Sequence, residues 1–123
     1  MRDSSRRATE IQIFGTRGSA DTRKALRFFS ERRTRTHFVD FTERGPTLGE
    51  LRRFTAKFGT QALIDRHGKR YAELGLGVSA RTDAWWELRL VEDPMLIIVP
   101  LVRFRDCLTV GLAERDWRLW LNS

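Results

Sequence analysis

Residues 10–32, EIQIFGTRGSADTRKALRFFSER, join a strand pattern directly to a helix pattern. Residues 10–14 alternate between polar and apolar side chains up to Gly15, which is the pattern of a β-strand that ends in a turn. From there, small and apolar side chains recur at the spacing of one helix face: Thr22, Ala25, Leu26 and Phe29. The stretch therefore predicts a strand that passes through a tight turn into an amphipathic helix over residues 20–32.

The next residues predict a second strand and a second helix. THFVDF (36–41) is rich in aromatic and β-branched residues, and we expect it to pair in parallel with the first strand. Thr47 is placed to cap a helix that ends at Gly59, a glycine expected in the left-handed conformation. The expected buried face of this helix consists of Leu48, Leu51, Phe54, Thr55 and Phe58.

Residues 66–92 predict a loop followed by a helix. RHGKRYAELGLGVS (66–79) is Gly-rich and polar, which is typical of a loop. Residues 80–92 predict a helix that ends before Pro94, because the residue that precedes a proline avoids the helical conformation. We expect this helix to dock on the sheet through its apolar side chains: Trp85, Leu88 and Trp86.

The last part of the chain predicts a hairpin and a closing helix. MLIIVPLVRF (95–104) and CLTVGL (107–112) are two β-rich runs around a short turn, and 113–121 place Trp117 and Trp120 on one helix face. The order βαβ, helices, ββα describes an α/β fold with a mixed four-stranded sheet, since a βαβ unit needs parallel strands and a hairpin antiparallel ones. This is the order of a thioredoxin-like fold with a helical insertion.

Length and composition limit the function classes. A chain of 123 residues predicts a single domain over 10–123, with a helical insertion at about 44–93 and a flexible tail over 1–9. One cysteine and two histidines argue against a disulfide framework, a multi-thiolate zinc site or another metal site, and no cofactor is expected. No apolar run approaches the length of about 18 residues that a membrane span needs. The N-terminus lacks the apolar stretch of a secretory signal, so we expect a cytoplasmic protein.

The net charge of +7 suggests nucleic-acid binding as one alternative, because clustered cations release counterions from phosphates. The basic residues are mostly arginines spread along the chain and mixed with acids, as a general preference for arginine would produce. The charge pattern therefore argues against nucleic acid as the partner, and nucleic-acid binding remains the second alternative.

Several motifs, in order, resemble the ArsC family of arsenate reductases and the related Spx regulators. They are IFG (13–15), SADTRKAL (19–26), ALIDRHGKRYAELGL (62–76), EDPMLIIVPL (92–101) and VGL (110–112). The resemblance covers about 10–121 and implies a thioredoxin-like core with a helical insertion. It also implies that Pro100 follows a cis peptide bond and faces the active-site loop.

In that family the position of Ser19 holds a reactive cysteine at the N-terminus of a helix. The helix dipole and unpaired N–H groups there lower a thiol pKa from about 8.5 into the range of about 3.5 to 7.5. Serine gains no comparable reactivity and forms no disulfide, so the resemblance implies a degenerate catalytic position. The simplest structural interpretation is that Ser19 only caps the helix.

The arginines that bind the anion in the reductases also differ here. The family pattern A-L-L-R corresponds here to Ala62-Leu63-Ile64 followed by Asp65, so the arginine is missing at that position and Arg66 lies one place later. The family's R-P is here Val99-Pro100, and a further family arginine falls at about Val110. The remaining candidates for binding an anion are Arg17, Gly18, Ser19, Arg23 and Arg66. Cys107 is expected to be a small packed residue, at the end of the sheet away from Pro100.

These residues predict a non-catalytic ArsC/Spx-like protein that acts by binding a protein partner or a small oxyanion, with a regulatory role as one form of this function. The resemblance to Spx implies RNA polymerase as one such partner. The alternative is an arsenate reductase-like thiol oxidoreductase, which needs a thiol near the start of the first helix.

Overall fold

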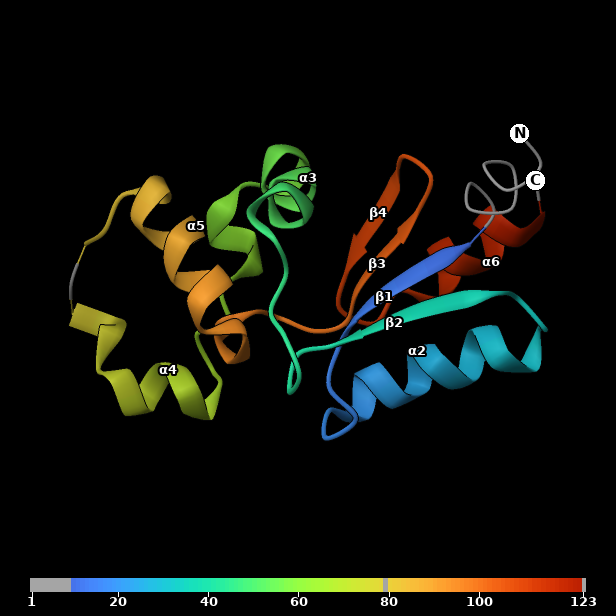
Figure 1. Cartoon of the computed structure of the whole chain (residues 1–123), viewed down its shortest axis with the longest axis horizontal. Helices are drawn as coiled ribbons and strands as arrows, with labels where there is room; N and C mark the ends of the chain where they lie inside the picture. The colour runs from blue at the N-terminus through green and yellow to red at the C-terminus, as the bar shows by residue number, and fades with distance from the viewer. Residues whose placement is uncertain (1–9, 79, 123) are drawn as a thin grey trace. The chain divides into compact units, whose positions relative to one another are not determined.

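A computed structural model describes residues 10–78 and 80–122, coloured along the chain in Figure 1. The chain forms two compact units. One is built from residues up to Asp40 and from Val99 onward, and the other consists of Phe41–Ile98. Each unit is described by itself below.

The first unit contains the predicted mixed sheet. Its strands are β1 (Ile11–Gly15), β2 (Thr36–Asp40), β3 (Leu101–Phe104) and β4 (Cys107–Val110), in the spatial order β2-β1-β3-β4. β1 pairs in parallel with β2 and antiparallel with β3, and β3 pairs antiparallel with β4. The fold class predicted from the sequence is confirmed.

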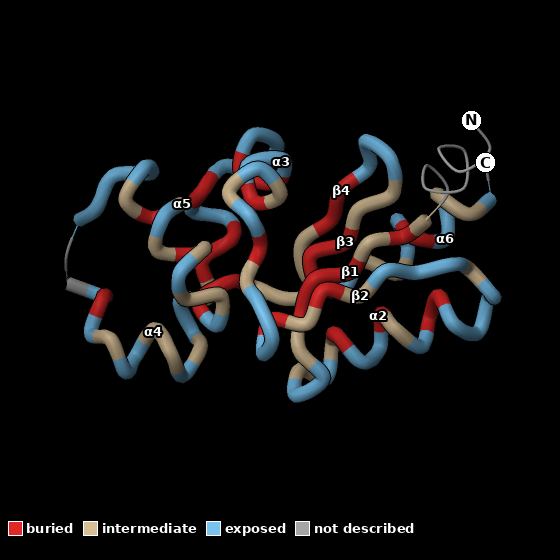
Figure 2. The backbone as a smooth tube through the Cα atoms, viewed as in Figure 1, coloured by how far each residue is buried: buried red, intermediate tan, exposed pale blue. Residues whose placement is uncertain are grey.

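Two helices, α2 (Ala20–Glu31) and α6 (Glu114–Asn122), supply side chains to one face of this sheet. The core of the unit is buried in full or nearly so, and consists of Ile11, Ile13, Ala25, Phe28, Phe29, Val102 and Trp117. Figure 2 shows the corresponding buried stretches along β1 and β3. The indole of Trp117 has no exposed surface, and its Nε1–H donates to Thr109 Oγ1 at 2.8 Å. This bond fixes α6 to β4 because a buried indole N–H needs an acceptor.

The second unit is helical. It contains α3 (Leu48–Phe58), η1 (Thr60–Leu63), α4 (Lys69–Leu74), η2 (Leu76–Val78), α5 (Asp83–Glu92) and η3 (Pro94–Leu96). An isolated bridge joins Ile64, in the middle of this unit, to Ile97 near its C-terminal end, and Ile98 N–H donates to Leu63 O at 2.8 Å. Because these bonds extend to Ile98, the unit reaches further along the chain than the predicted insertion at about 44–93.

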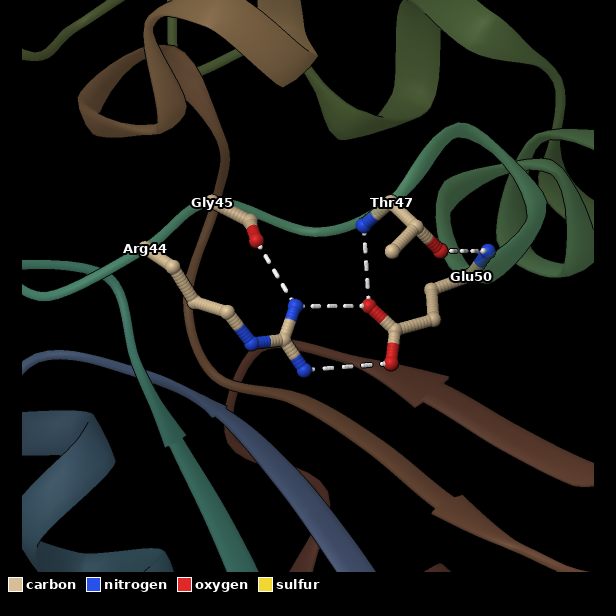
Figure 3. A network of polar contacts seen from close by, with 4 residues as sticks. All are labelled: Arg44, Gly45, Thr47 and Glu50. Atoms are coloured by element: carbon tan, nitrogen blue, oxygen red, sulfur yellow. Dashed lines mark hydrogen bonds and ion pairs between the residues drawn. The ribbon is translucent and has the colours of Figure 1, made fainter.

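Thr47 caps α3, as predicted, through the reciprocal network drawn in Figure 3. Its Oγ1 accepts from Glu50 N–H at 3.0 Å, while Glu50 Oε1 accepts from Thr47 N–H at 2.9 Å. Arg44 donates to both carboxylate oxygens of Glu50, at 3.0 and 3.3 Å, and to Gly45 O at 2.9 Å. Burial alone would raise the pKa of Glu50, but the hydrogen bonds from Arg44 and Thr47 outweigh it, so this pKa lies below its ordinary value.

Three local predictions for the helical unit are wrong. Residues 69–74 form α4, and the loop predicted over 66–79 is therefore interrupted by a helix. Phe58 is 37% exposed, because it is the last residue of α3 before the chain turns at Gly59. Gly59 has the positive φ of 84° that was expected, but its ψ of 150° is extended and not left-handed helical.

The predicted buried face of α5 is also wrong in part. Leu88 is 58% exposed, whereas Trp86 and Leu90 are buried. Trp86 and Leu90 are four residues apart and share a face, and Leu88 lies between them on the opposite side. The helix contacts α3, η1 and η3 within its own unit.

Candidate functional site at the start of α2

Ser19 is the N-cap of α2. Its backbone is extended, with φ −84° and ψ 125°, and its Oγ accepts a hydrogen bond from Thr22 N–H at 3.1 Å. Ser19 N–H donates to Thr16 O at 3.1 Å, and Ser19 O accepts from Arg23 N–H at 3.0 Å. The side chain therefore satisfies one of the N–H groups that a helix leaves without an internal partner.

The end of β1 packs closely against the first turn of α2. Thr22 has no exposed surface, and a Cβ on Gly15 would lie 2.5 Å from Thr22 Oγ1. A side chain at position 15 would clash with Thr22, so glycine is required where β1 ends and the loop begins. Thr22 Oγ1 is buried and makes no hydrogen bond to any residue that the structure describes.

The basic candidates Arg17 and Arg23 lie in the same loop and first turn. Arg23 Nη1 donates to Arg17 O at 2.7 Å, which holds the loop against the helix. The Arg17 guanidinium lies over the Phe38 ring, 4.9 Å from its centroid. Both arginines and Gly18 are exposed, so remaining guanidinium N–H groups face solvent.

The first turn of α2 contains groups that would attract an anion and one that would repel it. The N–H groups of Ala20 and Asp21 belong to the first turn, where a helix has no carbonyl partners for them, and the helix dipole favours negative charge there. Asp21 places a carboxylate in that same turn and already supplies such a charge. An added anion is therefore attracted by Arg17 and Arg23 and repelled by Asp21.

Arg66, the remaining basic candidate, belongs to the helical unit and is held by neighbours there. Its Nη1 donates to Tyr71 Oη at 2.9 Å, and its Nη2 contacts Gln61 Oε1. The guanidinium also lies 5.7 Å from the ring centroid of Tyr71 and 5.9 Å from that of Trp86. Tyr71 lies in α4, the helix that was predicted as a loop, so these contacts could not be predicted from the sequence pattern.

Pro100 and Cys107 lie at opposite ends of the sheet. The Val99–Pro100 peptide bond is cis, and Pro100 O accepts from Gly111 N–H at 2.8 Å. Leu101, the next residue, pairs with Phe14 near the end of β1 that leads into the Ser19 loop. Cys107 pairs with Phe104 beside the hairpin turn, at the end predicted for it.

The expected packing of Cys107 is wrong, since its side chain is exposed. It is the first residue of β4, an edge strand with a neighbour on one side only. Within residues 10–78 and 80–122, no three His, Cys, Asp or Glu side chains come together as a metal site would require, and no helix is long and apolar enough to cross a membrane.

Comparisons with known proteins match this fold over nearly its whole length. The arsenate reductase from Vibrio cholerae has a TM-score of 0.76 and 22% identity, covering 88% of this chain and 94% of its own. A Staphylococcus aureus COL protein solved by NMR has a TM-score of 0.72 and 26% identity, covering 89% and 96%. An arsenate reductase related protein from Brucella melitensis has a TM-score of 0.66 and 17% identity, covering 93% and 96%.

Among curated proteins, no sequence matches the chain. The model of the ArsC family matches residues 3–119, which is nearly all of the sequence. This match and the thioredoxin-like arrangement of the sheet agree with each other, and the chain belongs to the ArsC family.

Proposed function

We propose that this ArsC-family protein acts by binding and does not reduce its ligand through a thiol. The observation that supports the proposal is the position of Ser19, whose Oγ accepts from Thr22 N–H at the head of α2. At this place the resemblance implies a cysteine thiolate. A hydroxyl group cannot be made anionic by a helix terminus, whose effect is about 0.3 to 2 kcal/mol, and it cannot form a disulfide.

The only cysteine of the chain does not replace the missing thiol. Cys107 is beside the β3–β4 turn, and the strand register places it at the end of the sheet opposite to Leu101 and Phe14. Thiol-based reduction needs the sulfur where the anion is bound, because reacting atoms must approach to about 3–3.5 Å. The exposed thiol of Cys107 lacks this relation to the Ser19 loop.

Two ligand classes fit a binding role. A small oxyanion would use the first-turn N–H groups together with Arg17 and Arg23, and the repulsion by Asp21 would keep such binding weak. A protein partner would use more of the surface, and the Spx regulators that the sequence resembles support a regulatory role of this kind. Fold alone does not choose between them.

The test of the proposal is an arsenate reduction assay with glutathione and glutaredoxin. The protein is compared with its Cys107→Ser variant, and the Vibrio cholerae arsenate reductase serves as a positive control. We expect no turnover above the rate without protein, for either form. Turnover at a rate comparable to that of the control enzyme would refute the proposal, and its loss in Cys107→Ser would identify the thiol responsible.

Binding is measured separately, by titrating ¹⁵N-labelled protein with arsenate, phosphate and sulfate. An oxyanion ligand predicts saturable shifts in the amide signals of Gly18, Ser19 and Ala20. The shifts should weaken in Arg17→Ala/Arg23→Ala and persist in Arg53→Ala/Lys57→Ala, which removes the same charge from α3. Absence of saturable shifts with all three anions would exclude the oxyanion and leave the protein partner.

A further inference from the structure

A basic groove lies between α2 and α6, away from the Ser19 cap. It has a volume of about 330 Å³ and lies in the sheet-containing unit. Four cationic side chains and two carboxylates line it, over the aromatic ring of Phe28: Lys24, Arg27, Arg32, Arg118, Glu31 and Glu114. The charges therefore favour an anionic occupant.

Three cations of the groove have no ion-pair partner among the residues that the structure describes. None of Lys24, Arg27 and Arg118 forms an ion pair with another residue in the described ranges 10–78 and 80–122. The two carboxylates of the groove lie beyond ion-pair distance of them. Like charges that share a groove without partners repel one another, and an anionic ligand relieves that repulsion.

Arg32 is held in place before any ligand arrives. Its Nη1 donates to Phe28 O at 3.0 Å, and its guanidinium carbon lies 3.7 Å from the centroid of the Phe28 ring. Stacking and one hydrogen bond fix the plane of the guanidinium and leave further N–H donors for a ligand. A fixed planar group of donors suits a carboxylate and loses little conformational freedom on binding.

The floor of the groove is part of the rigid core. Phe28 is 4% exposed and packs edge-on against Phe29 and Trp117, with centroid distances of 5.0 and 5.4 Å. Trp117 is itself fixed by its hydrogen bond to Thr109. The groove is therefore supported by the packing that holds α2 and α6 on the sheet.

We propose that this groove is the docking surface for an acidic segment of a protein partner. Carboxylates of the segment pair with Arg27, Arg32 and Arg118. A peptide fits the mixed charges better than a nucleic acid does, because Glu31 and Glu114 would repel a continuous line of phosphates. A peptide can place a basic or amide side chain opposite these two groups. The inference depends on neither the chemistry of Ser19 nor the absence of reductase activity.

The test uses a short fluorescein-labelled peptide of Glu, Asp, Gln and Lys with net negative charge, and measures its affinity by fluorescence anisotropy. A peptide of the same length made of Ser, Gln and Ala is the neutral control. We expect saturable binding of the acidic peptide, weakened by about tenfold in Arg27→Ala/Arg118→Ala, since each exposed pair contributes little alone. The matched control Arg53→Ala/Lys57→Ala removes the same charge from α3 and should change the affinity by less than about twofold.

Arg32 is tested with a conservative variant, because Arg32→Ala would remove the charge together with the planar donors. Arg32→Lys keeps the charge and loses the planar donors, so we expect a weaker affinity than wild type, with far-UV circular dichroism checking that the variant is folded. Amide shifts on peptide binding should map to α2 and α6. The proposal is overturned if the acidic peptide does not bind, or if the amide shifts map to other elements. It is also overturned if the groove variants and the control variant lose affinity for the peptide equally, or if a single-stranded oligonucleotide of equal charge binds more tightly than the peptide.

Discussion

Ser19→Cys should create a thiol with a lowered pKa, since the backbone at the head of α2 is already arranged for a thiolate. The variant is made together with Cys107→Ser, so that only one thiol titrates. The sulfur replaces an oxygen that accepts from Thr22 N–H at 3.1 Å. The matched control is Ser30→Cys in the same background, which places a thiol on the exposed last turn of the same helix.

The expected shift follows from the contacts at the cap. A helix terminus stabilises an adjacent charge by about 0.3–1 kcal/mol when exposed and up to about 2 kcal/mol when partly buried. A hydrogen bond to a charged group adds about 1.5–3 kcal/mol. The carboxylate of Asp21, in the first turn, offsets part of this gain. A net stabilisation of about 1.5–2.5 kcal/mol corresponds to a pKa about one to two units below the ordinary value of about 8.5.

The pKa is measured from the ultraviolet absorbance of the thiolate against pH, and independently from the pH dependence of alkylation by iodoacetamide. Ser19→Cys should titrate at about 6.5–7.5, and Ser30→Cys at or above about 8.5, because the C-terminal end of a helix disfavours a negative charge. Equal pKa values for the two variants would show that the start of α2 does not stabilise a thiolate, which would refute the prediction.

Three further predictions concern stability, measured by chemical denaturation. Ser19→Ala should lower the free energy of unfolding by about 1 kcal/mol, because Thr22 N–H loses its acceptor; an unchanged stability would show that water replaces the cap without cost. Gly15→Ala should cost about 1–3 kcal/mol, since the new Cβ would lie 2.5 Å from Thr22 Oγ1. Gly15 has no positive φ, so the cost should shrink in a Thr22→Ala background, and an equal cost there would contradict the steric explanation. The bonds from Arg44 lower the pKa of Glu50, so the stability that wild type gains over Glu50→Gln should be complete above the ordinary pKa of 4.5 and disappear as the pH falls through the lower folded-state value; a gain that persists in strong acid would contradict this sign.

The sequence predicted the elements whose signals are local. Ser19 and Thr47 could be identified as caps because a hydroxyl stands directly before an amphipathic helix in each case. The strand pairing followed from the βαβ order and the hairpin, and β1, β2 and β4 lie close to their predicted positions. The third prediction, a β run over 95–104, is wrong in its first half, because Pro94–Leu96 form η3 and β3 begins only at Leu101, after Pro100.

The features that could not be predicted from the sequence depend on packing. α4 has six residues between Gly68 and Gly75, so its composition resembles that of a loop, and contacts made after folding decide its form. The aromatic partners of Arg66 come from α4 and α5 and could not be predicted without that helix. The exposure of Cys107 and the α2–α6 groove likewise depend on which surfaces the neighbouring elements leave uncovered.

The first unit is discontinuous in the chain, which affects the order in which it can form during synthesis. Ile13 pairs with Val102, and the whole of Phe41–Ile98 is made between them. Until β3 and α6 leave the ribosome, β1 and α2 lack core partners that bury them, among them Val102 and Trp117. The entropic cost of closing the intervening segment grows only slowly with its length. The contacts between β1 and β3 nevertheless join residues far apart in the sequence, and such contacts form slowly. The nascent N-terminal segment therefore cannot complete its core until the part of the sequence from Val99 onward has been translated.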